Sequence, residues 1–218
     1  MNYAEIKNCD IANGPGIRVS LFVSGCTHRC PGCFNREAWD FTYGEPFDQS
    51  VIDRILADLS PAFISGLTLL GGEPFDPRNQ AAVLELLRQV RAAYPEKSIW
   101  AFTGYLFDRD LLAGHVGDGA VCREYLEHLD VLVDGPFVEA EKNLTLRFRG
   151  SANQRLIDVP ASLKRGEVVL WEDWQGDGRG LKEWDPLKSK SSAPGRICPP
   201  TARNSPPVQT STPVWRPM

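Results

Sequence analysis

Four short apolar segments of this chain each run into a loop of glycine and polar residues, and this repeat constrains the fold more than any other feature. The segments are residues 18–23, 67–70, 98–103 and 131–133. They show no alternation of apolar and polar residues, which is typical of strands buried on both faces of a sheet. Amphipathic spacing predicts helices at 49–59, with Asp48 as N-cap, at 78–93 and at 119–128. The sequence therefore predicts an α/β fold of parallel strands with right-handed helical crossovers, and further strands at 144–149 and 168–171.

The polar loops follow the carboxyl ends of the predicted strands. They are a cysteine loop after residue 23, a Gly-Gly-Glu-Pro loop at 71–74, Thr103 with Gly104, and Asp134 with Gly135. In an α/β barrel or an open parallel sheet, this edge is where active sites are built. We therefore expect four separate segments to meet around one site.

The cysteine loop holds Cys26, Cys30 and Cys33, and thiolates are soft ligands that suit iron–sulfur clusters and zinc. A closed structural zinc site or an electron-transfer cluster needs four protein ligands, so three predict a cluster with one iron left open for a small molecule. His28, inside the loop, is interpreted as a surface imidazole rather than as a ligand or a tuner of the cluster. Cys9 and Cys122 are interpreted as small, partly buried apolar residues.

The Gly-Gly-Glu-Pro loop has its own physical interpretation. Gly71 and Gly72 allow the backbone to approach a ligand closely. Pro74 stiffens the turn and removes a donor, so that carbonyl groups suited to an ammonium group dominate locally. An ordinary strand-to-helix turn is the alternative. The earlier turn at 13–16 precedes Arg18, whose side chain either faces solvent or holds an acidic group.

Composition excludes some functions and divides the chain. The net charge of −4 among 218 residues gives no sign of nucleic-acid binding. No apolar run approaches the roughly 20 residues that a membrane span needs, and the first residues do not resemble a secretory signal. Reduced cysteines predict a cytoplasmic protein. We expect one domain at 1–173 and a flexible Pro/Ser-rich tail at 174–218, which contains Cys198.

Several motifs, in order, resemble those of one family. Residues 26–33 carry the radical S-adenosylmethionine signature, and residues 71–74 resemble the methionine-amine loop of that superfamily. More closely, the sequence resembles the activating proteins of anaerobic ribonucleoside-triphosphate reductases from about residue 1 to about residue 172. The segments that carry this likeness are 13–18, 26–35, 102–105, 133–137 and 150–155. Family members are usually shorter, so the segment 174–218 has no explanation in the resemblance.

The resemblance implies a fold, a reaction and a set of cofactors. The fold is a partial, open β/α barrel of the radical S-adenosylmethionine type. Cys26, Cys30 and Cys33 bind a [4Fe–4S] cluster whose fourth iron is chelated by S-adenosylmethionine. An electron, from a donor such as reduced flavodoxin, cleaves the sulfonium to methionine and a 5′-deoxyadenosyl radical. That radical removes a hydrogen atom from a glycine of the partner reductase, which then makes deoxyribonucleotides without oxygen.

The resemblance also assigns residues to the ligand. Gly71, Gly72, Glu73 and Pro74 belong to the loop that contacts the methionine part. Phe34 packs near the adenine or the cluster. Thr103 and Asp134 match positions that line the ligand pocket in related activases, with Asp134 holding a monovalent cation; a strand-end turn is the alternative for Asp134. Asn153 and Arg155 fall in a family motif from which no role is derived.

Two alternatives remain at this stage. In the first alternative, the chain activates another glycyl-radical enzyme, such as one of the formate-lyase type. In the second alternative it is a non-catalytic zinc-binding or electron-carrier module, with Cys9, Cys122 or His28 as a fourth ligand. This second alternative leaves the loop at 71–74 without a purpose.

Overall fold

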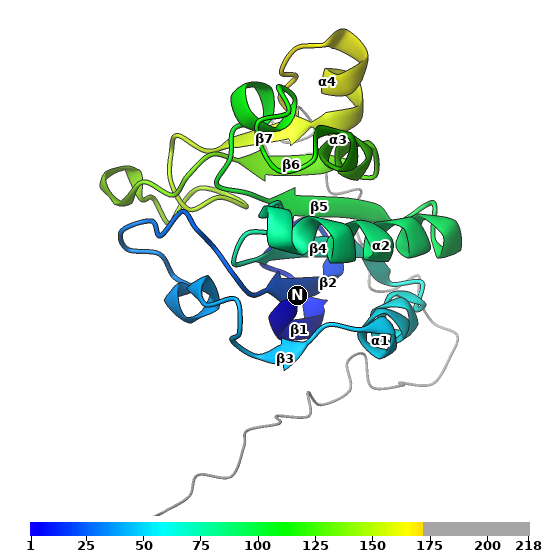
Figure 1. Cartoon of the computed structure of the whole chain (residues 1–218). Coiled ribbons are helices and arrows are strands. Elements are labelled where there is room, and N and C mark those ends of the chain that lie inside the picture. Colours follow the sequence, from blue (N-terminus) through cyan, green and yellow to red (C-terminus); the bar gives the residue numbers. More distant parts are fainter. Residues whose placement is uncertain (172–218) are drawn as a thin grey trace, which may run out of the picture.

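The structure, a computed structural model, describes residues 1–171, and these form one seven-stranded sheet covered by helices. The strand order is β3-β1-β2-β4-β5-β6-β7, visible from bottom to top in Figure 1. The strands are β1 (Asn2–Asp10), β2 (Ile17–Val23), β3 (Glu45–Pro46), β4 (Ile64–Gly71), β5 (Ser98–Phe102), β6 (Val131–Asp134) and β7 (Arg155–Asp158). The helices are α1 (Gln49–Leu59), α2 (Pro77–Ala93), α3 (Gly119–Glu127) and α4 (Val159–Arg165). Shorter 3-10 or π turns lie at Arg36–Trp39, Phe107–Leu111 and Glu139–Glu141.

The centre of the sheet is parallel and its edges are antiparallel. Strands β2, β4, β5 and β6 pair in parallel, as the sequence predicted. Strand β1 pairs antiparallel with β2 and with β3, and β7 pairs antiparallel with β6. These three outer strands were not predicted; β3 has only two residues, and β1 is interrupted by register shifts.

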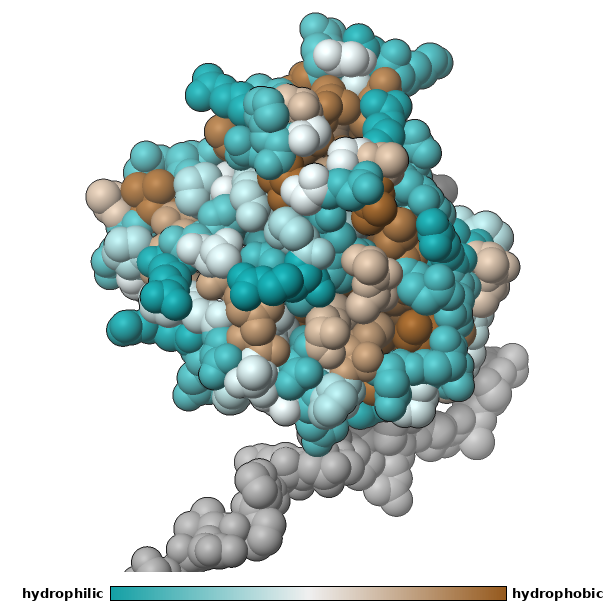
Figure 2. Space-filling view, in the orientation of Figure 1, coloured by the Kyte–Doolittle hydropathy of each residue, from teal (hydrophilic) through white to brown (hydrophobic). Residues whose placement is uncertain are grey.

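Successive residues of the central strands pack on opposite faces of the sheet, which explains why their sequences do not alternate. In β5, Ile99 and Ala101 join the core beneath the helices, whereas Trp100 belongs to a second cluster with Val131 and Val133. In Figure 1, α1, α2 and α3 lie on the near side of the sheet. Hydrophilic side chains cover most of that face of the molecule (Figure 2). Both faces of β5 and β6 therefore carry apolar side chains.

Helix starts follow the expected side-chain caps. The Asp48 carboxylate accepts a hydrogen bond from Val51 N, so the predicted cap of α1 is confirmed. Asp76 caps α2, which begins at Pro77, one residue before the predicted start. Asp118 caps α3, which ends at Glu127, one residue before the predicted end.

The predicted strand at 144–149 is wrong. This segment is a series of turns, in which the Asn143 side chain accepts hydrogen bonds from Thr145 N and Thr145 Oγ1. Such a side chain competes with ladder formation. Phe148 also has a φ of +56°, outside the strand region. At 168–171 only one bridge forms, between Leu170 and Ile157. The predicted tail, including Cys198 and the boundary at 173, lies outside the described residues.

The buried guanidinium of Arg18 fits neither expectation for this residue. Its side chain is fully buried and bonds no carboxylate. Instead it donates to Thr68 Oγ1 at 2.7 Å, and to the carbonyl oxygens of Leu67 and Ser98 at 2.7 and 2.9 Å. Burial lowers the pKa of Arg18 to about 10. Arg18 therefore ties β2 to β4 and β5 beneath the site.

Substitution of Arg18 by methionine is expected to lower the free energy of unfolding by about 3–5 kcal/mol, because it leaves buried acceptors unpaired. Urea denaturation of the metal-free protein measures this change. Arg54→Met is the control, because Arg54 is largely exposed on α1 and 3.9 Å from its ionic partner Asp58. The control is expected to change stability by no more than about 0.5 kcal/mol. Equal free energies of unfolding for the two variants would show that the buried hydrogen bonds of Arg18 do not stabilise the fold.

In the part of the chain that the structure covers, no helix combines the length and the apolar character that crossing a membrane requires.

Candidate functional site

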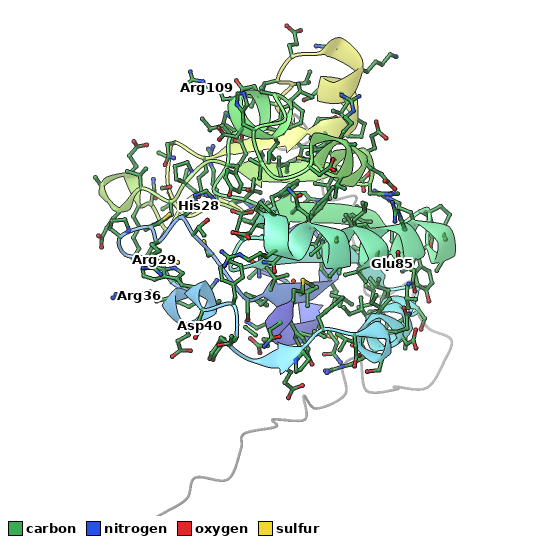
Figure 3. All side chains as sticks on the ribbon, viewed as in Figure 1. His28, Arg29, Arg36, Asp40, Glu85 and Arg109 are labelled. Atoms are coloured by element: carbon green, nitrogen blue, oxygen red, sulfur yellow. The ribbon has the colours of Figure 1, made fainter. Side chains whose placement is uncertain are left out.

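A pocket of about 560 Å³ lies at the carboxyl ends of the parallel strands. The predicted loops line it together: Cys26, Cys30, Cys33 and Phe34 after β2, Gly71, Gly72 and Glu73 after β4, Thr103 and Gly104 after β5, and Gly135 after β6. Figure 3 shows His28, Arg29 and Arg36 along the cysteine loop and the turn that follows it. The structure thus brings the four loops to one place, while the ligands assigned to them stay predictions.

Backbone hydrogen bonds anchor the cysteine loop, and its three thiols form no disulfide bonds. Gly25 N and Cys26 N donate to the carbonyl oxygens of Ala38 and Trp39 at 2.8 and 3.1 Å. Cys26, Cys30 and Cys33 are free thiols, each partly buried. Burial, and secondarily the charge of Glu73, raises the pKa of Cys26 to about 11. A metal that binds this thiol must therefore displace its proton.

The three thiols fit an iron–sulfur cluster better than a single ion. Among residues 1–171, no three histidine, cysteine or acidic side chains are grouped closely enough to hold one metal ion. A cluster, in contrast, takes thiolates at separate irons and needs soft sulfur donors around a shared pocket. Three free thiols lining one pocket are such a donor set.

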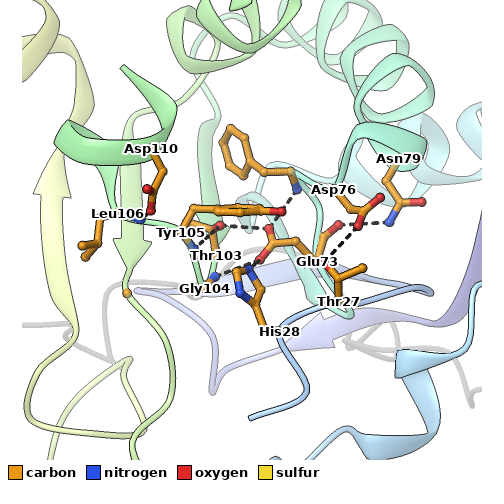
Figure 4. Close-up of polar contacts among 12 residues, drawn as sticks. Thr27, His28, Glu73, Asp76, Asn79, Thr103, Gly104, Tyr105, Leu106 and Asp110 are labelled. Carbon is orange, nitrogen blue, oxygen red and sulfur yellow. Dashed lines mark hydrogen bonds and ion pairs between the residues drawn. The ribbon is translucent and has the colours of Figure 1, made fainter. Parts of the chain in front are cut away.

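The carboxylate of Glu73 is the polar centre of the site (Figure 4). The Glu73 side chain is only 1% exposed. Oxygen Oε1 accepts hydrogen bonds from Phe75 N and Thr103 Oγ1, both at 2.9 Å. Oxygen Oε2 accepts one from Gly104 N at 2.8 Å and lies 3.0 Å from His28 Nε2. Glu73 therefore joins the cysteine loop, the loop after β4 and the end of β5. Thr103 is equally committed, since its Oγ1 also accepts from Tyr105 N.

The interpretation of His28 as a surface imidazole was wrong. Its side chain is only 19% exposed, and its ring centroid lies 4.4 Å from that of Tyr105. A Cβ on Gly104 would come within 2.6 Å of the imidazole, so the glycine makes room for it. Burial lowers the pKa of His28, but the hydrogen bond and charge of Glu73 outweigh it, so the pKa is raised. Neither the carboxylate nor the tight approach could be found from the loop sequence.

The two glycines of the loop after β4 are explained by close approach of the chain to itself. Gly71 has a φ of +104°, and a Cβ on Gly72 would lie 2.5 Å from the Gly25 carbonyl oxygen. Gly72 N donates to Val23 O at 2.7 Å. Pro74 is buried. The Glu73 carbonyl is already taken by Asn79 Nδ2 and Asp76 N, so it is not one of the exposed carbonyls expected here.

Two residues assigned to the ligand by resemblance have unexpected surroundings. Phe34 lines the pocket but is 99% exposed, so it packs on nothing in the described chain. Asp134 is fully buried and does not line the pocket; it accepts from Arg155 Nε at 2.9 Å and from Phe107 N at 2.8 Å. Its predicted role as a cation ligand stays a prediction.

Sequence reasoning missed part of the pocket wall. Several residues between 142 and 154 line it, among them Lys142, Leu144, Arg149 and Gln154. Asn13, from the turn before β2, lines it as well. The motif at 150–155 was among the segments that carried the family resemblance, but the contacts that explain it depend on pairing between β6 and β7.

Comparisons with known proteins agree with this site. Residues 12–157 match the model of a family described as a 4Fe-4S single cluster domain. The chain is 43% identical over 158 residues to the anaerobic ribonucleoside-triphosphate reductase-activating protein of Enterobacteria phage T4, covering 72% of this chain and 93% of that protein. This chain belongs to the family of anaerobic ribonucleoside-triphosphate reductase-activating proteins. The resemblance drawn from the motifs is thereby confirmed.

Other members of this family of activating proteins match over nearly the same span. The protein of Pasteurella multocida is 44% identical over 156 residues, which are 71% of this chain and 95% of that protein. The protein of Escherichia coli K12 is 42% identical over 156 residues, 71% of this chain and 96% of that protein. More than a quarter of this chain therefore lies outside the match to these nearly full-length relatives.

Proposed function

We propose that this chain activates an anaerobic ribonucleoside-triphosphate reductase by generating a glycyl radical on it. Cys26, Cys30 and Cys33 would hold a [4Fe–4S] cluster, with S-adenosylmethionine as the second cofactor. The observation that carries this proposal is the shared pocket, in which three free thiols lie beside Gly71 and Gly72. When bound, the cluster supplies the electron that releases a 5′-deoxyadenosyl radical from S-adenosylmethionine, and that radical takes a hydrogen atom from a glycine of the reductase.

The chain's own residues position the reactants. Gly71 and Gly72 bring the loop after β4 against the cysteine loop, which supports a place there for the methionine part. Glu73 acts indirectly, because its carboxylate is buried and holds His28, Thr103 and Gly104 in place. Phe34, exposed beside Cys33, is free to cover a ligand. A monovalent cation at Asp134 would share the carboxylate with Arg155.

The finer descriptions of fold and surroundings belong to the same proposal. A mixed sheet with its helices on one side supports a partial β/α barrel of the radical S-adenosylmethionine type. A reducing cytoplasm suits free thiols and a cluster. A one-electron donor such as reduced flavodoxin would reduce the cluster.

The zinc or electron-carrier alternative is less well supported by the contacts. Cys122 is buried in the core on α3, with its Sγ 3.7 Å from Leu111 O. His28 directs Nε2 at Glu73 rather than at the thiols. Neither side chain is arranged as a fourth ligand, and Cys9, the third candidate, is not among the free thiols of the described chain.

The test is electron paramagnetic resonance of the partner reductase after anaerobic incubation with this protein, S-adenosylmethionine and a strong reductant. We expect a glycine-centred doublet that is absent when S-adenosylmethionine is omitted. A formate-lyase-type enzyme in place of the reductase tests the other glycyl-radical partner. A doublet only on that enzyme would reassign the partner, and a colourless protein with one tightly held zinc and no doublet would overturn the proposal.

A further inference from the structure

Three consecutive side chains, Asn153, Gln154 and Arg155, hold three consecutive residues at the end of β6. Asn153 Nδ2 donates to Pro136 O at 2.8 Å, and Gln154 Nε2 donates to Gly135 O at 3.1 Å. Arg155 donates through Nε and Nη2 to the two carboxylate oxygens of Asp134, at 2.9 and 2.5 Å. We name residues 153–155 the clamp.

The clamp replaces the backbone ladder at the point where β6 and β7 separate. The last backbone pair is Asp134 with Arg155. Beyond it, the carbonyl oxygens of Gly135 and Pro136 would lack strand partners, and the side-chain amides of the clamp supply them. Gly135 has a φ of +97°, so the chain turns sharply here and the clamp determines where it goes.

Gln154 connects two segments of the pocket wall. While its Nε2 holds Gly135 O, its Oε1 accepts hydrogen bonds from Gly150 N at 2.8 Å and from Ser151 N at 3.2 Å. Gly135, Gly150 and Gln154 itself all line the pocket. One amide therefore joins the beginning and the end of the connection between β6 and β7.

The wall held by Gln154 is separated from the two-glycine loop, although Glu139 of the same β6–β7 connection approaches Gly32 of the cysteine loop. Strand β5 lies between β4 and β6, so the loops after β4 and β6 are separated by about 10 Å. This wall continues into Leu144, which is 90% exposed although it lines the pocket. Phe34, on the cysteine loop, is the only side chain among the exposed large apolar residues of 1–171 that is more exposed. Exposed apolar side chains at a pocket mouth are suited to contact with another macromolecule.

We propose that Gln154 is a positioning residue, which sets the pocket wall against which the reductase presents its glycine segment. This inference rests on the proposed function of the pocket. It requires that the wall affect use of the reductase more than binding of S-adenosylmethionine, since the two-glycine loop belongs to the other side.

Gln154→Glu tests the proposal in the full-length, cluster-loaded protein. Glutamate retains an oxygen for Gly150 N and Ser151 N but replaces the donor to Gly135 O with an oxygen that repels it. We expect faster hydrogen–deuterium exchange of the amides at 135–138. We also expect about a tenfold higher KM for the reductase, with the rate at saturating reductase and the Kd of S-adenosylmethionine changed less than about twofold, because the loss is of order one hydrogen bond.

Gln89→Glu is the matched control. Gln89 lies on α2, outside the pocket lining, and its amide also donates to side-chain oxygens, those of Gln49 and Glu85. It is expected to leave both readouts unchanged. If Gln154→Glu does not fold, Asn153→Asp removes the neighbouring donor to Pro136 O and is expected to shift both readouts in the same direction by less.

The outcomes separate this inference from the proposed function. Wild-type exchange at 135–138 in the variant would overturn the positioning role, whatever the activity. Faster exchange with an unchanged KM for the reductase would overturn the link to the partner. Failure of the wild-type protein to form a glycyl radical would instead contradict the proposed function, while the exchange result would still decide whether Gln154 holds the wall.

Discussion

Alanine at Cys26, Cys30 or Cys33, one at a time, is expected to abolish formation of the glycyl radical on the reductase. Each substitution removes one of three thiols that line the pocket, and the histidine and carboxylate beside them, His28 and Glu73, are paired with each other. Because a cluster is held by its thiolates, we expect iron bound after anaerobic reconstitution to fall to a small fraction of the wild-type amount. Iron and sulfide analysis measures the cluster, and the glycine-centred doublet measures the activity.

Cys122→Ala is the control for this series. Cys122 is a free thiol too, but it is buried in the core on the inner face of α3. Its replacement is expected to lower the free energy of unfolding by about 1 kcal/mol through the small cavity, while bound iron stays at the wild-type level. Normal iron content and normal cleavage of S-adenosylmethionine in any of the three pocket variants would refute the assignment of the cluster.

Glu73→Gln is expected to lower the free energy of unfolding by about 3 kcal/mol, although the two side chains have nearly the same size. The carboxylate accepts from Phe75 N, Thr103 Oγ1 and Gly104 N and lies beside His28. An amide presents a donor where one of these donors points, and a buried donor left unpaired costs about 1–3 kcal/mol, more beside a charged group. Urea denaturation of the metal-free variant measures the change without the contribution of metal binding.

Glu73→Gln should also weaken the attachment of the cysteine loop to the rest of the protein. His28 lies two residues from Cys26 and loses its ionic partner, so we expect slower and less complete cluster reconstitution than in the wild type. Glu85→Gln is the control, because Glu85 is half-exposed on α2 and pairs only with surface groups. A Glu73 variant as stable as the Glu85 variant would show that the buried network does not hold the site together.

The central part of the fold was predictable from local patterns. Strands β2, β4, β5 and β6 are largely apolar on both faces: one face packs under the helices, and on β5 and β6 the other face joins the cluster around Trp100. Caps such as Asp48 act over a few residues, so the start of α1 could be predicted from the residues next to it in the sequence. The outer strands could not, since β3 and β7 are strands only through their pairing with β1 and β6.

The candidate site divides in the same way. The loops after the parallel strands were correctly expected to meet, because parallel strands end at one edge of their sheet. The environments of His28, Arg18 and Asp134 were not foreseen. Each depends on a partner distant in the sequence: Glu73 for His28, Ser98 for Arg18 and Arg155 for Asp134.

By itself, the sequence determined the family, the three thiols and the order of strands and helices at the centre of the sheet, since these depend on residue type and on spacing along the chain. Only the tertiary structure decided that the Glu73 carboxylate holds loops together, that Asp134 does not line the pocket, and that residues 153–155 support the pocket wall formed by the β6–β7 connection. The physical reason is that a buried polar group must find its hydrogen-bond partners wherever the fold brings them, and those partners lie tens of residues away.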